Sequence, residues 1–505
     1  MTHKSTDRPA GRASGALVPV LAFVGIVVSA MQTLLVPVLK DLPRLLDADP
    51  GDTTWVITAT LLSGAVATPI MGRLGDLHGK RRMLLLSLAV MVVGALVSAL
   101  TNDLLTMIAG RALQGFAMSV IPLGIGLLRD ILPREKLGSA MALMSSSMGV
   151  GSGLALPAAA LVAQHTDWHV LFYGSAGLGL LGVVLTLLVV PESPVRAQGT
   201  FDVLGAVGLS AGLVLLLLPI TKGSDWGWTS GTTLGLFATA AVVLVLWGAM
   251  ELRLKAPLVN LRTTARPAVL LTNLASIMVG VSFLVVSLVL PQLLQLPKAT
   301  GYGLGQSMVV AGLLMAPLGL TMMVTTPVHA RLSGKYGPRS TLILGMVIIA
   351  LGYGSGLGLL NAPWQSVVIT VILGPGIALA YSSLPALIIG AVPASETGAA
   401  NGLNTLMRSI GSSAASAVVG TVLAGTAHSV NGVTVPAMRG FQISFLIAAG
   451  AMAVGLLIAL FLPRAHPPGV PRNEHEDLTR TAPTDSDPAH ASACGRARTR
   501  VQEGR

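Results

Sequence analysis

A short charged segment between two apolar stretches contains the residues of this chain that are best placed to do chemistry. In residues 72–82 one carboxylate, Asp76, stands among four Lys and Arg side chains. A carboxylate in this setting can form ion pairs, and at the N-terminus of a helix it is also stabilised by the helix dipole. The pattern indicates a charged contact that can be made and broken. Its candidate members are Gly72, Arg73, Asp76, Gly79, Lys80 and Arg81.

Because apolar stretches flank it on both sides, residues 72–82 are expected to form a tight loop between two membrane helices. Glycines allow the backbone to reverse sharply, and Gly72 and Gly79 are the candidates for that reversal. The excess of Lys and Arg predicts that this loop lies on the cytoplasmic side.

A second group of candidates lies inside the apolar stretches. Arg111 lies several residues within one of them, with Gln114 one turn later. An arginine inside a membrane is costly unless it faces a cavity or a polar partner. At about 1.5 Å per residue, Gln32 lies at a similar depth and is a candidate partner for Arg111. The three residues predict a relay or polar site, and the alternative is an arginine that extends to the outer interface.

Two further patterns concern helix faces. Asn401, Asn404 and Arg408 are spaced i, i+3, i+7, so they share one face of a helix, and a polar face in a membrane should line the interior of the bundle. The alternative is that they only join two helices together. Gly149 and Gly153 form a small-residue face that lets another helix approach closely, and Pro157 is expected to bend the same helix. Ordinary close packing is the alternative for these residues.

The elements that must position all these residues are membrane helices. Hydrophobic residues make up 52% of the chain and charged residues 10%, against roughly 25% charged in soluble domains. Many apolar stretches approach the ~20 residues that cross the hydrocarbon core of a bilayer. Fourteen spans are predicted: 16–38, 54–72, 83–100, 104–127, 138–163, 169–190, 203–220, 230–250, 267–290, 304–327, 340–360, 365–390, 396–424 and 441–462. A peripheral hairpin is the alternative for 203–250.

The distribution of Lys and Arg predicts that both termini are cytoplasmic. Outside the two tails, 15 of these residues fall in loops that this topology places inside and 5 in loops that it places outside. The predicted parts are a cytoplasmic N-tail (1–15), a six-helix half (16–190), a linker with two extra helices (191–266), a second six-helix half (267–462) and a disordered cytoplasmic C-tail (463–505).

The two halves share a weak internal repeat. Within residues 329–339 the pattern of residues 72–82 recurs at an offset of 258 positions, but Gly334 stands where the first copy has Asp76. Parallel repeats of this kind build transporters whose substrate site lies between the halves.

Composition and spacing disfavour several other classes of protein. The net charge of +11 is spread over short loops and forms no basic stripe, so a nucleic-acid partner is not expected. The single cysteine, Cys494, excludes an intrachain disulfide, and the scattered histidines predict no metal site. No cluster of nucleophile and base indicates an enzyme, and no cofactor is expected. A non-transporting receptor or scaffold is disfavoured because no soluble sensory domain is evident.

Residues 72–82 resemble the signature loop between helices 2 and 3 of the major facilitator superfamily. In that family the aspartate caps a neighbouring helix, pairs with an arginine and holds the outward-facing state closed on the cytoplasmic side. Arg111, Gln114 and Gly115 resemble the R-x-x-Q-G motif of proton-coupled members, whose arginine is implicated in proton transfer. Residues 396–411 resemble a helix of the fourteen-helix drug:proton antiporters.

The chain also departs from that antiporter pattern. Leu156 precedes Pro157 where the signature has Gly-Pro, and Gln32 is the nearest polar residue to a position where those antiporters carry an aspartate. No Asp or Glu lies deep in a predicted span, although a proton carrier normally needs a carboxylate or a histidine. The remaining candidates are Asp41, Asp52 and Asp76. Because a central acid is what would favour cations, we expect substrates that are neutral, zwitterionic or anionic as readily as cationic.

The resemblance implies an all-α integral membrane protein with the major facilitator fold, built from two six-helix halves and an extra central pair. It implies a secondary active transporter of the cell membrane that exports antibiotics or other lipophilic small molecules by proton antiport and alternating access. Its partners would be a drug-like substrate, protons and membrane lipid, and it would act as a monomer. The alternative is a proton symporter or uniporter that imports a metabolite on the same fold.

Overall fold

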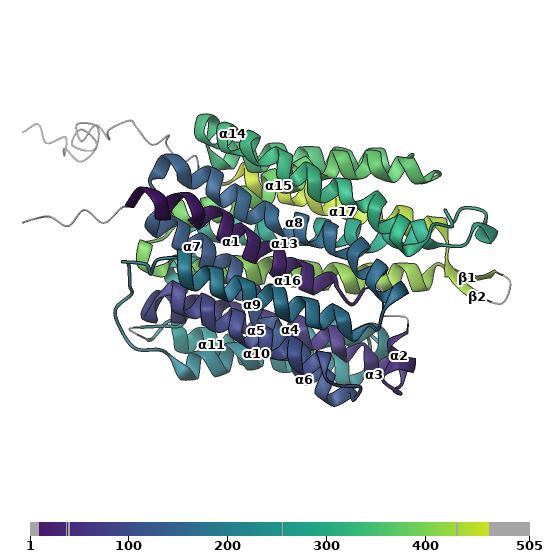
Figure 1. Cartoon of the computed structure of the whole chain (residues 1–505), viewed down its shortest axis with the longest axis horizontal. Helices are drawn as coiled ribbons and strands as arrows, with labels where there is room; N and C mark the ends of the chain where they lie inside the picture. Colours follow the sequence, from purple (N-terminus) through teal and green to yellow (C-terminus); the bar gives the residue numbers. More distant parts are fainter. Residues whose placement is uncertain (1–9, 37, 39–40, 255, 431–432, 464–505) are drawn as a thin grey trace, which may run out of the picture. The chain divides into compact units, whose positions relative to one another are not determined.

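The computed structural model of the chain is a bundle of long helices with one short β-hairpin (Figure 1). It describes residues 10–36, 38, 41–254, 256–430 and 433–463. The predicted N-tail is therefore described only from residue 10, where the first helix already begins. The predicted C-tail lies outside the described residues from position 464 onward.

The helices follow the predicted order of two halves and an extra pair. In the first half the spans are α1 (Ala10–Thr33), α4 (Trp55–His78), α5 (Lys80–Ala99), α6 (Leu104–Gly115) continued through η1 (Phe116–Ser119) into α7 (Val120–Ile131), α8 (Arg134–His165) and α9 (His169–Val189). The extra pair is α10 (Val203–Trp226) and α11 (Gly231–Glu251). In the second half they are α13 (Pro267–Gln295), α14 (Met308–Gly356), α15 (Pro363–Ala391), α16 (Thr397–Gly425) and α17 (Met438–Leu460).

Short elements connect these spans. They are α2 (Leu42–Leu45), α3 (Pro50–Thr53), α12 (Leu261–Thr264), η2 (Lys298–Thr300), η3 (Ala394–Glu396) and the antiparallel strands β1 (Ala427–Val430) and β2 (Val433–Pro436). Figure 1 shows α2, α3 and the hairpin at the end of the bundle opposite the start of α1. We call the end at which α1 begins the proximal end, and the opposite one the distal end.

The prediction of fourteen spans agrees with the structure. Thirteen helices among the described residues are long and apolar enough to cross a membrane, and one of them, α14, runs for 49 residues. Helix α14 is interrupted at Gly337, whose φ is 81° and ψ 160°. It therefore supplies two spans, 308–336 and 338–356. Glycine tolerates this backbone conformation, and Pro338 suits the first turn of the helix that follows.

The expected loop at residues 72–82 is almost entirely helical, which corrects the prediction. Helix α4 continues to His78 and α5 begins at Lys80, so the only non-helical residue between them is Gly79, with φ 112°. Gly72 lies inside α4 and makes no turn. A Cβ atom on Gly72 would lie 2.4 Å from the carbonyl oxygen of Gly398, so this glycine allows α16 to approach. The second copy of the segment is likewise helical except at Gly337.

The internal repeat is visible as two matching bends. Gly79 and Gly337 are 258 positions apart, the offset of the repeat, and both have a positive φ. The arginine two residues after each bend holds the last helix of its own half. Arg81 donates from its Nη2 to the carbonyl oxygen of Leu187 in α9 at 2.7 Å, and Arg339 does the same to Leu460 at the end of α17 at 2.7 Å.

The extra pair packs beside the line where the two halves meet. Helix α10 contacts both α4 and α16 through an apolar cluster that includes Ala65, Leu209 and Leu406. Helix α11 packs on α10. Only 11% of its most apolar 18-residue stretch is buried, so α11 is the most exposed of the described spans. Near the distal end the buried Lys222 of α10 donates to the carbonyl oxygen of Gly51 at 2.9 Å, which ties the pair to the first half.

The two bends predict a graded response to alanine. Gly337→Ala should lower the free energy of unfolding by about 1–3 kcal/mol, because alanine is strained in that conformation while no neighbouring atom lies near the new Cβ. Gly79→Ala should cost more, since its Cβ would also lie 2.8 Å from the carboxyl carbon of Glu192. Thermal unfolding in detergent would measure both. Gly334→Ala, in helical and open surroundings, is the matched control and should leave the melting temperature unchanged or higher.

Candidate functional site: a charged latch between the halves

The two halves touch most closely where α4 crosses α16. The backbones of Gly72 and Gly398 approach so closely that a Cβ atom on Gly398 would lie 2.5 Å from the carbonyl oxygen of Gly72. This contact places the last turn of α4 against the first turn of α16. Unpaired N–H groups are a property of every helix N-terminus, so this position needs an acceptor.

Asp76 is that acceptor. Its Oδ1 accepts the N–H of Gly398 at 2.9 Å, and its Oδ2 accepts the N–H of Ala399 at 2.9 Å. The carboxylate is fully buried. It therefore caps α16 across the boundary between the halves, where the positive end of the helix dipole favours a negative charge.

Lys80 lies between two carboxylates and balances them. Its Nζ is 3.2 Å from Asp76 Oδ1 and 2.7 Å from Asp130 Oδ2, and its side chain is fully buried. Ser193 donates a further hydrogen bond to Asp130 Oδ2 at 2.5 Å. Lys80 is thus the cation that accompanies Asp76 in this structure, and it draws α7 into the same cluster.

Arg129 makes a second connection between the halves. Its Nη2 donates to the carbonyl oxygen of Val392 at 3.1 Å, and its Nη1 donates to the hydroxyl of Thr397, the first residue of α16. Neither Asp130 nor Arg129 was among the candidates drawn from the sequence. An Arg-Asp pair at the end of a span was the available signal, but it did not show that the pair reaches Lys80 and Thr397. We call Asp76, Lys80, Asp130, Arg129 and Thr397 the latch.

Arg73 forms no ion pair with Asp76, although the family resemblance implied an arginine partner for that acid. It projects from α4 beside the latch, is 7% exposed, and its Nε has no hydrogen-bond partner. It lines a cavity of about 180 Å³ together with Asn260 and Glu396, which hydrogen-bond to each other at 3.0 Å. The ion pair fails because Lys80, four residues after Asp76 and in reach of Asp130, already occupies the carboxylate.

Arg81 is held away from Asp76 by a different acid. Its backbone N–H donates to Glu192 Oε1 at 3.0 Å, so Glu192 caps the start of α5. This acid lies in the segment after α9, and nothing in the local sequence linked it to Gly79 or Arg81. Arg81 belongs to the bend between α4 and α5 and not to the contact between the halves.

Arg111 and Gln114 form a buried polar pair in the first half. Arg111 is 2% exposed, which rules out an arginine that extends to the interface in this structure. It donates from Nη1 to Gln114 Oε1 at 2.6 Å and from Nε to the carbonyl oxygen of Val56 at 3.4 Å. Among the described residues no hydrogen bond joins it to Gln32, which corrects that expected contact, because α6 packs against α4 and α5.

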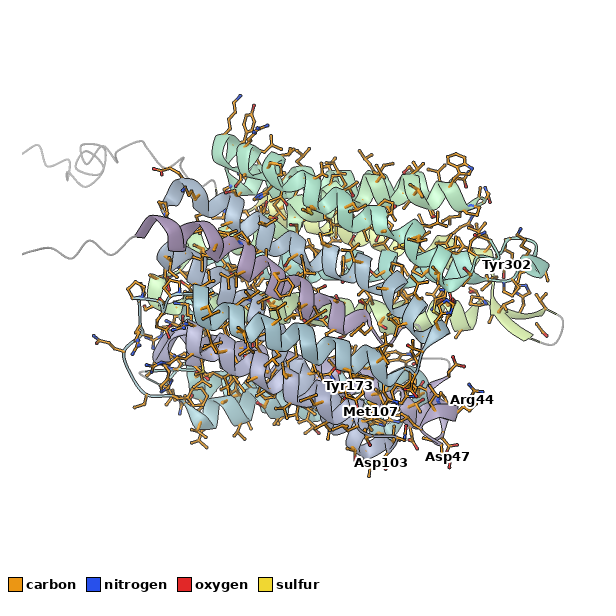
Figure 2. The ribbon with its side chains drawn as sticks, in the orientation of Figure 1. Arg44, Asp47, Asp103, Met107, Tyr173 and Tyr302 are labelled. Carbon is orange, nitrogen blue, oxygen red and sulfur yellow. The ribbon has the colours of Figure 1, made fainter. Side chains whose placement is uncertain are left out.

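An acid at the distal end fixes the start of the helix that carries Arg111. Figure 2 shows Asp103 and Met107 at the distal end, where Arg44 and Asp47 also lie. Asp103 Oδ2 accepts the backbone N–H and the hydroxyl of Thr106, each at 2.8 Å. These two bonds hold the pKa of Asp103 below its ordinary value. The charged form of this acid therefore caps α6.

The small-residue face of α8 packs against α14 of the second half. A Cβ atom on Gly319 would lie 2.5 Å from the carbonyl oxygen of Gly149, and one on Gly312 would lie 3.0 Å from the nitrogen of Pro157. Gly153 faces Gly319 with more room. Gly149, Gly153 and Pro157 thus lie on a second interface between the halves, next to the Thr326 hydroxyl that donates to Ser146 at 3.1 Å.

The polar face of α16 is divided between helix contacts and unpaired groups. Asn404 Nδ2 donates to Asn273 Oδ1 at 3.0 Å and to Ser276 Oγ at 2.6 Å, which joins α16 to α13. The side-chain oxygen and nitrogen of the buried Asn401 both lack a hydrogen-bond partner. The guanidinium carbon of Arg408 lies 4.8 Å from the centre of the Tyr381 ring of α15. Tyr381 was missed because a single tyrosine in an apolar helix carries no pattern.

Comparison with known proteins identifies the family. A sequence model of the Major Facilitator Superfamily matches residues 21–415 and, in a second match, residues 272–500. The chain belongs to this superfamily. It is a multi-pass membrane transporter.

Several curated relatives cover most of the chain. The tetracenomycin C resistance and export protein of Streptomyces glaucescens is 28% identical over 412 residues, covering 79% of this chain and 74% of that protein. The multidrug resistance protein Stp of Mycobacterium tuberculosis is 26% identical over 462 residues, covering 88% and 82%. The probable actinorhodin transporter of Streptomyces coelicolor is 28% identical over 415 residues, covering 79% and 70%.

Solved structures support the fold at low sequence identity. The human organic anion transporter MFSD10 superposes with a TM-score of 0.61 at 14% identity, covering 90% of this chain and 100% of that chain. The proton:xylose symporter XylE gives a TM-score of 0.63 at 13% identity, covering 89% and 96%.

The interface between α8 and α14 predicts a contrast between two glycines that face each other. Gly319→Ala should destabilise the protein by about 1–3 kcal/mol, because its Cβ would meet the backbone of α8 and the two halves would have to separate slightly. Gly153→Ala should be neutral, since its Cβ would lie 3.6 Å from Gly319 Cα. Melting temperatures in detergent would test this, and equal losses for both variants would contradict the close approach at Gly319.

Proposed function

We propose that this transporter exports antibiotics or other lipophilic small molecules by proton antiport, through alternating access. The observation that carries the proposal is the latch. Asp76 of the first half caps α16 of the second half, so one end of the bundle is held shut by a contact that must break when that end opens. Two relatives are named as a tetracenomycin C resistance and export protein and as a multidrug resistance protein. These names support export as the direction of transport and drug-like molecules as the class of substrate.

We assign roles to the remaining candidates on the same basis. A cytoplasmic gate around the latch would include Gly72, Arg73, Gly79 and Arg81. The excess of Lys and Arg in residues 72–82 favours the cytoplasmic side for the end of the bundle that carries the latch. Arg111 and Gln114 are proposed as the polar or proton-relay site, with Gln32 as a further member that makes no hydrogen bond to Arg111 in this structure. Gly149, Gly153 and Pro157 are proposed as the helix-kink motif, and Asn401, Asn404 and Arg408 as the lining of a substrate cavity between the halves.

The proposal extends to topology and assembly. We propose that both termini are cytoplasmic, that 16–190 and 267–462 move as the two halves, and that 191–266 joins them with its extra pair. The bundle would work as a monomer, because both sides of the latch come from one chain.

The direction and energy source can be tested by export from energised cells that overexpress the chain. With a panel of fluorescent lipophilic compounds, we expect extrusion that an uncoupler abolishes. Unchanged or increased accumulation across the whole panel would instead support the alternative, a symporter or uniporter that imports a metabolite. A vector-only strain is the control for endogenous pumps.

The charge of the substrate can be tested by competition. Arg111 and Arg408 are both buried, and no carboxylate among the described residues forms an ion pair with either. A substrate cavity that contains buried arginines without acid partners should not require a cationic substrate. We expect neutral, zwitterionic and anionic lipophilic drugs to inhibit export of a fluorescent substrate as readily as cationic drugs do. A strong preference for quaternary cations would contradict this.

The latch predicts the effect of removing one charge. Asp76→Asn should abolish export while the protein still folds and inserts, because the amide cannot accept both N–H groups of α16 as a carboxylate does and leaves Lys80 with a single partner. Export and detergent melting would be measured together. Asp103→Asn, an acid outside the latch, is the matched control and should retain export. Full activity of Asp76→Asn would show that the latch has no part in transport.

A further inference from the structure

Two carboxyl groups meet at one end of the extra pair. Asp202 directly precedes α10, and Glu251 is the last residue of α11. Both lie against Gly205, where an added Cβ atom would be 2.1 Å from Asp202 Oδ2 and 2.4 Å from Glu251 Oε1. The two oxygen atoms can therefore be no further apart than the sum of these distances. Trp247, one turn before Glu251, donates from its Nε1 to the carbonyl oxygen of Gly205 at 2.8 Å and fastens the same corner.

Neither group has a cation to balance it among the residues that the structure describes. Glu251 is 2% exposed, and neither of its oxygens has a hydrogen-bond partner; Asp202 Oδ2 also lacks one. The N–H groups of Leu258 and Val259 and the indole N–H of Trp247 lie near the Glu251 carboxyl, but none of them forms a hydrogen bond with it.

The charged groups of neighbouring elements are engaged elsewhere or point to other surroundings. On α12, Arg262 donates to the carbonyl oxygen of Leu252 at 3.3 Å, and Arg253 is exposed. Arg73 of α4 and Glu396, which precedes α16, line the cavity described above. Two ionised carboxylates this close together, with burial and without a cation among the described residues, repel each other strongly. Such pairs resolve the conflict by sharing one proton.

The two helix ends indicate which group keeps the charge. Asp202 Oδ1 accepts the N–H of Gly205 at 2.8 Å, so this side chain caps the N-terminus of α10, where the helix dipole stabilises a negative charge. Glu251 lies at the C-terminus of α11, where the dipole disfavours one. The neutral, protonated partner is therefore Glu251.

We propose that Asp202 and Glu251 form a binding site for one proton, carried by Glu251 and shared with Asp202. The site joins the ends of α10 and α11 while it is occupied. Loss of the proton at higher pH would place two negative charges in contact and push the ends apart. Leu258 and Val259, which lie beside Glu251, also line the cavity that Arg73 lines, so the site adjoins this cavity beside the latch. The proposal does not depend on the substrate or on the direction of transport.

Infrared difference spectroscopy on the purified full-length protein tests the proposal without any substrate. The carbonyl stretch of a protonated carboxylic acid is distinct from the bands of a carboxylate. We expect the wild type to show this carbonyl band at neutral pH and to lose it at alkaline pH. Glu251→Gln should lack the band. In Asp202→Asn the band should disappear at a pH lower by about one unit or more, because the neighbouring negative charge is gone.

Two further variants complete the test. Glu135→Gln, which changes an exposed acid at the start of α8, should leave the band unaltered. Gly205→Ala puts a methyl group between the two oxygens and should also move the loss of the band to lower pH, so it carries the test if Glu251→Gln does not fold. A neutral-pH spectrum without a carboxylic acid band, or a band that survives in Glu251→Gln, would overturn the proposal. Export by the same variants is measured separately, so failure of the exporter assignment would leave this result intact.

Discussion

The contact between the Asp76 carboxylate and the first turn of α16 is the constraint on which the arrangement of the two halves depends. One side chain satisfies two otherwise unpaired N–H groups in a fully buried position. That geometry requires the two backbones to touch, and only glycine at positions 72 and 398 permits this. A buried carboxylate in turn requires a compensating charge, which Lys80 supplies from the next helix. The glycines, the acid and the lysine are thus consequences of a single requirement.

The buried cations elsewhere are accommodated differently. Arg111 is satisfied by a carbonyl oxygen and an amide, and Arg408 lies over an aromatic ring. Neutral dipoles and ring faces hold a positive charge less strongly than a carboxylate does. In the latch, by contrast, charges are paired within a few ångströms. The buried charge pairs of the latch thus lie at one boundary between the halves, and Arg111 and Arg408 have no acid partner among the described residues.

Hydropathy was sufficient to predict the spans, because each span depends on the composition of one continuous segment. The choice of Asp76 was also possible, since an acid among cations stands out in the sequence. The end of α4 was not predicted correctly. The charged segment 72–82 suggests a loop, whereas the helix continues to His78. The partners of Asp76 were only partly found. Asp130 is 50 positions away from Lys80 and Thr397 is 268 positions away from Arg129, and a single sequence contains no signal that joins them. The carboxyl pair in the extra helices was hidden for the same reason.

The two bends at Gly79 and Gly337 both have a positive φ, and each is followed by an arginine that contacts the last helix of its half. Among the described residues, however, only the first copy carries charges that reach the other half. In the second copy Gly334 and Pro338 stand where the first has Asp76 and Lys80. The molecule is therefore symmetric in shape but asymmetric in energy. Its two halves have equivalent joints, while the buried charges that link the halves at this end come from one copy of the repeat. Under the mechanism proposed above, a change at that one charged position would shift the balance between the two conformations without altering the joints themselves.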